Sequence, residues 1–105
     1  MTQKEFDNVV EDRLKLVKSS LIAKNKEYSR DNKPLHNFDK ASRISGQSRE
    51  KALWGFALKH YVSFMDILDD MDKDSMPSKE HIEEKIGDLI NYLIICEASI
   101  KDKIK

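Results

Sequence analysis

The chain has 105 residues, and 19 Lys and Arg residues balance 19 Asp and Glu residues to a formal net charge of zero. We assign residues 1–105 to a single domain, which at this length buries only roughly 60 to 65% of its unfolded surface. The balanced charge supplies no overall field for polyanions, which excludes general nucleic-acid binding and attraction to an anionic membrane.

The first predicted helix runs from Glu5 to about Tyr28. Its apolar residues recur at steps of three, four or seven, which is the helical period; they are Phe6, Val10, Leu14, Val17, Leu21 and Tyr28. Acidic residues crowd its first turns, and Lys24 and Lys26 lie in its last turn. The helix dipole favours this distribution of charge.

Residues 29–47 break the helical period and contain Pro34 and Gly46. A connection this long is either functional or poorly ordered, and we favour a functional loop. Phe38, Ala41 and Ile44 are spaced three apart, which is enough for one or two helical turns that hold the loop against the core.

Polar residues at the start of this loop and within it form a candidate ligand-binding group: Lys24, Glu27, His36, Asn37, Lys40 and Arg43. Cations with asparagine and histidine donors, beside an acidic metal site, are what a nucleoside triphosphate requires. The spacing of these residues also fits a loop that is simply solvated, so both interpretations stay open.

The second predicted helix runs from about Arg49 to Met71, with Ser48 as its cap. Very little of its circumference is polar. Its aromatic residues stand at helical spacing, which favours the core over a base-stacking platform; they are Trp54, Phe56, Tyr61 and Phe64.

One polar stripe does follow this second helix, at positions i, i+4, i+7 and i+11: Lys59, Ser63, Asp66 and Asp70. The stripe is either the solvent face of the helix or one wall of a site. His60 lies about 100° round the helix from Lys59. It is either a hydrogen-bonded core histidine or a phosphate donor or proton carrier, and in the second case Lys59 and His60 are candidate catalytic residues.

The third predicted helix follows Pro77 and Ser78 and runs to about Lys103. Six residues form one apolar face, namely Ile82, Ile86, Leu89, Leu93, Cys96 and Ile100. Four more apolar residues fall outside that face: Ile90, Tyr92, Ile94 and Ile95. A helix that is apolar on all sides is normally buried on all sides, and three helices cannot surround two of their own. We therefore expect a homo-oligomer that completes the bundle.

Within this third helix Glu84, Asp88 and Asn91 follow at i, i+4 and i+7, so their side chains project in one direction. An ionised carboxylate among apolar residues must be paired, hydrogen-bonded or bound to a cation. Two carboxylates four residues apart can hold one magnesium ion. The alternative is a solvated Glu84 and an Asp88 that pairs with a lysine.

The single cysteine, Cys96, cannot form an internal disulfide, and the first 20 residues contain no signal-peptide core. The longest apolar run, Leu93 to Cys96, is far too short to span a bilayer. We therefore expect a cytoplasmic protein with no membrane contact. Glycine-rich phosphate loops, G-x-S-x-G and H-E-x-x-H are missing from the sequence, which excludes P-loop enzymes, serine hydrolases of that type and zincins.

The run Glu84-Lys85-Ile86-Gly87-Asp88-Leu89-Ile90-Asn91-Tyr92-Leu93 resembles the E-E-L-G-D-L-L-x-Y-L segment of MazG-like all-α nucleoside triphosphate pyrophosphohydrolases. Lys-Asn-Lys-Glu-Tyr at 24–28, followed by Asn37-Phe38, is similar to the K-x-x-x-Y and N-F of their phage-borne relatives. The resemblance covers about residues 20–98. It implies a helical bundle that assembles as a dimer or tetramer and uses magnesium, held by acidic residues on two helices, to cleave a nucleotide between its α and β phosphates.

Carried over by position, Asp88 matches the terminal metal-binding aspartate of that family. Lys85 stands where the family has a glutamate, and Glu84 is the nearest substitute. The second E-x-x-E pair of the family has no literal counterpart, although Asp66, with Asp69 or Asp70, offers carboxylates at similar spacing. These departures bear on catalysis more than on the fold or on nucleotide binding.

Three hypotheses follow. The first is a magnesium-dependent nucleotide pyrophosphohydrolase in which Asp88, Glu84 and Asp66 hold the metal and Lys40, Arg43 and His60 meet the phosphates. The second is a non-catalytic phage accessory or counter-defence protein, located in the host cytoplasm, that binds a nucleotide or a host protein on the same scaffold. The third is a helical assembly module in which every polar residue is structural.

Overall fold

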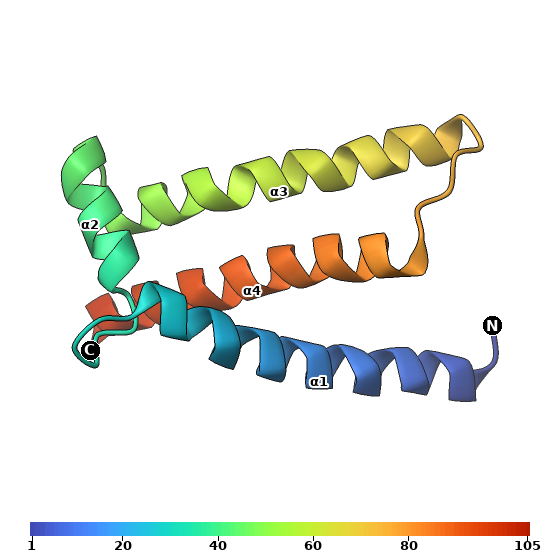
Figure 1. Ribbon diagram of the computed structural model, residues 1–105, viewed down its shortest axis with the longest axis horizontal. Coiled ribbons are helices and arrows are strands. Elements are labelled where there is room, and N and C mark those ends of the chain that lie inside the picture. The colour runs from blue at the N-terminus through green and yellow to red at the C-terminus, as the bar shows by residue number, and fades with distance from the viewer.

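The computed structural model describes all 105 residues and contains four α-helices and no strands (Figure 1). The helices are α1 (Gln3–Tyr28), α2 (His36–Ser45), α3 (Arg49–Asp72) and α4 (Lys79–Ile104). This confirms the all-α class. The three long helices match the predicted ones to within two residues at each end, whereas the segment predicted mainly as a loop holds the ten-residue helix α2.

Side-chain caps fix where the long helices begin. Thr2 and Glu5 form a reciprocal capping box at the start of α1. The hydroxyls of Ser48 and Ser78 each accept a hydrogen bond from the backbone N–H three residues later, at the starts of α3 and α4. The predicted cap at Ser48 is therefore confirmed.

Helix α2 is stabilised mainly by one buried side chain. A ten-residue helix is marginal in water without tertiary packing, and Phe38 supplies that packing because it is only 3% exposed. Its ring meets Tyr28 of α1 and Phe56 of α3 edge-on, with ring centroids 5.2 and 6.0 Å away. Ile44 was predicted to hold this segment as well, but it is 82% exposed, so that part of the prediction is wrong.

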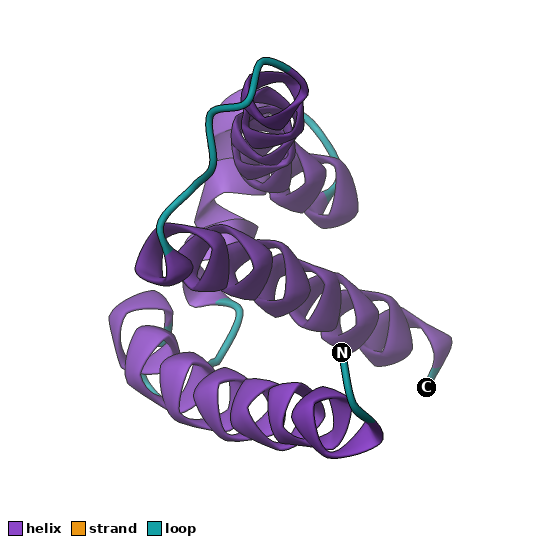
Figure 2. Ribbon diagram, turned by 90° about the vertical axis from the view of Figure 1, so that its right-hand side faces the viewer, coloured by secondary structure: helices purple, strands orange, loops and turns teal.

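The three long helices lie in layers, with α4 between α3 and α1 (Figure 2). Helix α4 packs against both neighbours, whereas the backbones of α1 and α3 do not approach each other. Helix α2 closes only one end of this stack (Figure 1). The core lies at that end and consists of Phe38, Leu53 and Ile95, with partly buried neighbours Leu21, Tyr28, Leu35, Tyr92 and Cys96.

The most buried positions of α4 are not its most apolar ones. Asp88, Asn91, Ile95 and Ser99 are its buried residues, so three polar side chains lie where an apolar face was expected. On the predicted face, Leu93 is 61% exposed. Helix α4 is the middle layer and is covered by a helix on each of two sides. Its buried residues therefore do not coincide with the single apolar face that the periodicity indicates.

The isolated chain is open. It exposes 7923 Å², whereas a compact monomer of 12.2 kDa exposes roughly 6,100 Å². Its radius of gyration is 16.0 Å, against about 13 Å for a compact domain of this length. The aromatic residues Trp54, Phe56 and Tyr61, predicted for the core, are more than 40% exposed in the chain. No helix carries an apolar stretch long enough to cross a membrane.

Candidate functional site

Asp88 joins the three layers. Its side chain is 10% exposed and stands on the middle helix α4. Lys24 of α1 donates a hydrogen bond from Nζ to Asp88 Oδ1 over 2.8 Å, and Nδ1 of His60 on α3 lies 3.3 Å from Oδ2. The carboxylate predicted to lie among apolar residues is therefore paired with a lysine of its own chain, which is the alternative considered from the sequence.

The two partners of Asp88 respond to it differently. The hydrogen bond that Lys24 donates to Asp88 raises the pKa of Lys24, so the ammonium stays charged. Burial lowers the pKa of His60 below 6.5, although the charge of Asp88 acts in the opposite direction. The imidazole stacks on the ring of Tyr92 with centroids 5.3 Å apart. His60 is thus a neutral ring at pH 7, held between a carboxylate and an aromatic face.

Asn91 lies one turn after Asp88 and is only 3% exposed. Its amide Nδ2 donates to the hydroxyl of Ser20 on α1 over 2.9 Å. Its carbonyl oxygen Oδ1 is buried and has no hydrogen-bond partner. An unpaired buried acceptor costs about 1 to 3 kcal/mol, so Asn91 keeps one unused hydrogen-bond acceptor next to the Asp88 pairs.

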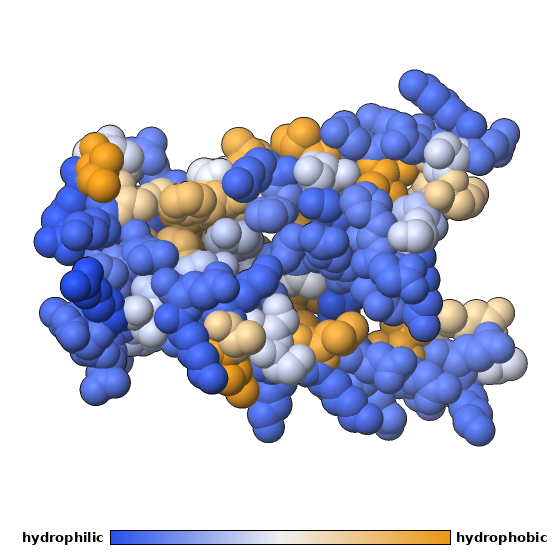
Figure 3. All heavy atoms as spheres, in the orientation of Figure 1, coloured by the Kyte–Doolittle hydropathy of each residue, from blue (hydrophilic) through white to orange (hydrophobic).

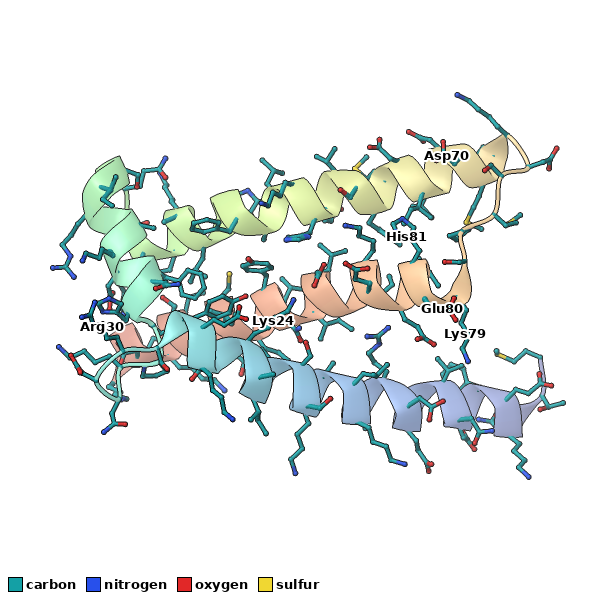
Figure 4. The ribbon with its side chains drawn as sticks, in the orientation of Figure 1. Lys24, Arg30, Asp70, Lys79, Glu80 and His81 are labelled. Carbon is teal, nitrogen blue, oxygen red and sulfur yellow. The ribbon has the colours of Figure 1, made fainter.

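A cavity of about 620 Å³ lies beside these residues, between α1 and α4, and reaches His60 on α3. This volume is in the range of small-molecule sites, but such sites are mostly apolar, and here only Leu16 and Val17 are hydrophobic. Besides Asp88 and Asn91 the cavity is lined by six charged or titratable side chains: Arg13, Lys24, His60, Glu80, Glu83 and Glu84. Figure 4 shows Lys24 and Glu80 well apart along the length of the bundle. A cavity with this lining suits a polar ligand that carries charge.

Gly87 lets Arg13 approach α4. A Cβ at Gly87 would lie 3.0 Å from Nη1 of Arg13, and Nη2 donates to the backbone carbonyl of Glu83 over 3.1 Å. Arg13 and Ser20 were missed from the sequence. The available signal was their spacing, because Arg13, Ser20 and Lys24 follow at i, i+7 and i+11 and so share one face of α1.

Five of the predicted site residues line the cavity: Lys24, His60, Glu84, Asp88 and Asn91. The other seven lie elsewhere, namely Glu27, His36, Asn37, Lys40, Arg43, Lys59 and Asp66. Asn37 and Arg43 instead donate to backbone carbonyls of Glu27 and Asp39, each over 3.5 Å. Helix α2 lies across the end of the bundle, so its polar residues do not reach the first half of α4, which lines the cavity.

The residues do not fit a protein-bound magnesium ion in this arrangement. Asp66 is exposed on α3 and outside the cavity, and both oxygens of Asp88 face Lys24 or His60. No group of three or more His, Cys, Asp or Glu side chains is placed to hold a metal ion. Of the candidate metal ligands only Glu84 and Asp88 share the cavity, and magnesium binding stays a prediction.

A second polar cluster ties the α2 end together. Arg49 donates to the hydroxyl and carbonyl oxygens of Ser99 and to the carboxylates of Asp39 and Asp102, over 2.7 to 3.1 Å. Glu50 accepts hydrogen bonds from Lys103 and from Ser99, which lower its pKa to about 2. The groups in this cluster satisfy one another, so its role is structural.

Comparison with protein-family models, with curated proteins and with solved structures finds no match to this chain. The resemblance of residues 84–93 to the MazG-like pyrophosphohydrolases therefore stays a prediction that rests on the motif. Functional conclusions depend on the cavity itself.

Proposed function

We propose that this chain binds a nucleotide in the cavity beside Asp88. The observation that carries the proposal is the lining of this cavity, which combines cationic and acidic side chains with Asn91, a residue whose buried carbonyl oxygen has no partner. A base or a sugar of a nucleotide brings the N–H or O–H donor that this oxygen lacks. Arg13, Lys24 and His60 in the same wall supply the cations and donors that suit phosphate groups.

The mixed charge of the cavity favours a nucleotide that arrives with magnesium. The carboxylates of Glu80, Glu83 and Glu84 would repel a bare polyphosphate, but they suit the hydrated magnesium ion that such a ligand carries. Magnesium is in this proposal part of the ligand. Affinity should therefore be higher with magnesium present than with a chelator.

Calorimetry with the common ribo- and deoxyribonucleotides, each with magnesium, tests the proposal. Lys24→Met should abolish measurable binding, because it removes the cation nearest Asp88. Lys26→Met is the matched control, since Lys26 is an exposed lysine of the same helix outside the cavity, and it should bind like the unaltered chain. Binding of no nucleotide, or an equal loss in both variants, would reject the site and leave the helical assembly module.

A second candidate function is cleavage of that nucleotide into a monophosphate and pyrophosphate. It is favoured by the four acidic residues of α4 that line one cavity, among them the Glu84 and Asp88 of the MazG-like motif. Incubation of the purified chain with nucleoside triphosphates and magnesium, followed by assay for pyrophosphate, tests it. Product that disappears in Glu84→Gln but persists in Asp66→Asn would support catalysis at this site. Binding without product would leave a non-catalytic nucleotide binder.

A further inference from the structure

The outer side of α3 carries an apolar stripe with heptad spacing. Trp54, Leu58, Tyr61, Met65 and Leu68 follow at steps of four, three, four and three, and each is 44 to 50% exposed. The rings of Trp54 and Tyr61 are 6.3 Å apart, so they share this side of the helix. Figure 3 shows apolar residues along the edge of the molecule formed by α3. This spacing is that of a coiled-coil seam, in which one helix packs along another.

The two ends of the stripe carry opposite charges. Lys51 lies three residues before Trp54, and Asp72 lies four residues after Leu68, so both continue the same spacing. The stripe is also nearly symmetric about Tyr61. In an antiparallel pair of α3 helices centred there, Lys51 of each copy faces Asp72 of the other. In a parallel pair like charges would meet at both ends, which disfavours that orientation.

The large exposed surface of the isolated chain agrees with a permanent interface between two copies. The chain exposes about 1,800 Å² more than a compact monomer of its mass. A standard stable interface covers about 800 Å² of each partner, and obligate homodimers cover more. The surplus is thus large enough for a dimer interface on each copy.

From the spacing, the end charges and the area we propose that two copies of this chain pair through α3 in antiparallel orientation about a two-fold axis at Tyr61. Trp54 of one copy then packs near Leu68 of the other, and Leu58 packs near Met65. Two-fold symmetry repeats every contact. The proposal does not depend on nucleotide binding, because none of the stripe residues lines the cavity.

Sedimentation equilibrium of the full chain measures the association. We expect a species of twice 12.2 kDa at micromolar concentration. Leu58→Glu should yield a monomer, whereas Leu93→Glu, which charges an even more exposed leucine on α4, should remain a dimer. A monomeric unaltered chain, or dissociation by Leu93→Glu with Leu58→Glu still dimeric, would overturn the proposal.

Charge exchange at the ends of the stripe tests the antiparallel orientation without altering the apolar residues. It therefore tests the proposed pairing even if Leu58→Glu fails to fold. Lys51→Asp or Asp72→Lys alone should weaken the dimer about tenfold, because symmetry doubles each change. The double variant Lys51→Asp/Asp72→Lys should regain the original dissociation constant. Failure of the double variant to recover would overturn the antiparallel pairing.

Discussion

An ionised carboxylate that is removed from water must be paired with an opposite charge or with N–H donors. Asp88 has such partners on both of the helices that flank α4. Lys24 comes from one outer helix and His60 from the other, so one residue of the middle layer ties all three long helices together. The same residue lines the cavity. A stability measurement and a binding measurement on Asp88 variants therefore report two separate properties.

Asp88→Asn should lower the free energy of unfolding by about 1 to 2 kcal/mol. Loss of one member of a fully buried pair costs more, but Lys24 stays 38% exposed and recovers part of its hydration. Urea unfolding measures the change. Asp66→Asn is the control, because Asp66 is exposed and makes no ion pair, and equal loss in the two variants would show that Asp88 does not hold the layers together.

His60 should make stability fall in mild acid. Burial lowers its pKa below 6.5, so between its folded and unfolded pKa values the unfolded chain binds more protons than the folded one. This contribution is fully present above about pH 6.5 and is lost as the pH falls below it. Urea midpoints at about pH 7.5 and about pH 5.5 should differ less in His60→Gln than in the unaltered chain. An imidazole resonance that titrates above 6.5 would contradict the prediction.

At the scale of the helices, local sequence determined where each long helix begins and ends, but not what it packs against. Periodicity and the Ser48 cap located α3. The formation of α2 required the burial of Phe38 against two other helices. The spacing within residues 29–47 predicted that Phe38 holds the segment against the core, but it did not identify the aromatic rings of α1 and α3 that cover it.

The site follows the same pattern. Asp88 and Asn91 stood out because polar residues are unusual inside an apolar run, and the structure brings both to the cavity. Arg13 and Ser20 did not stand out, because polar residues are ordinary on a helix as charged as α1. The polar residues of the 29–47 segment were assigned to the site because their side-chain types suit a triphosphate. Nothing in their spacing tells which end of a bundle a short helix covers.

The two helix-interior glycines should respond to alanine by different amounts. Gly55 of α3 has open space around it, so Gly55→Ala should raise the free energy of unfolding by about 0.5 to 1 kcal/mol through helix propensity alone. Gly87→Ala should gain less, because the new Cβ displaces the guanidinium of Arg13. In an Arg13→Ala background the gain at position 87 should rise to that at position 55. Equal gains at the two glycines in the unaltered chain would show that Arg13 does not depend on Gly87.

At the scale of the whole molecule, the chain is a stack of layers with one closed end. The buried hydrophobic cluster at the α2 end contains three residues, and beyond it the layers are held by the Asp88 pairs and by the packing of α4 against each outer helix. The apolar residues of the second and third predicted helices indicated that these helices are buried on all sides. In the single chain each of these helices is buried on some sides and exposed on others. The exposed stripe on α3 is the part of that pattern which a second copy would satisfy.

A fold completed by association should become more stable as the protein concentration rises. If dimer formation and folding are linked, mass action favours the folded dimer over unfolded chains, and the melting temperature depends on concentration. Thermal unfolding followed by circular dichroism should therefore shift upward by several degrees between about 1 µM and about 100 µM chain. Leu58→Glu should melt at a lower temperature that no longer depends on concentration, whereas Leu93→Glu should keep the dependence. A melting temperature that is constant over this range in the unaltered chain would mean that its three-residue core and polar ties suffice for a monomer, and the surplus surface would then need a different explanation.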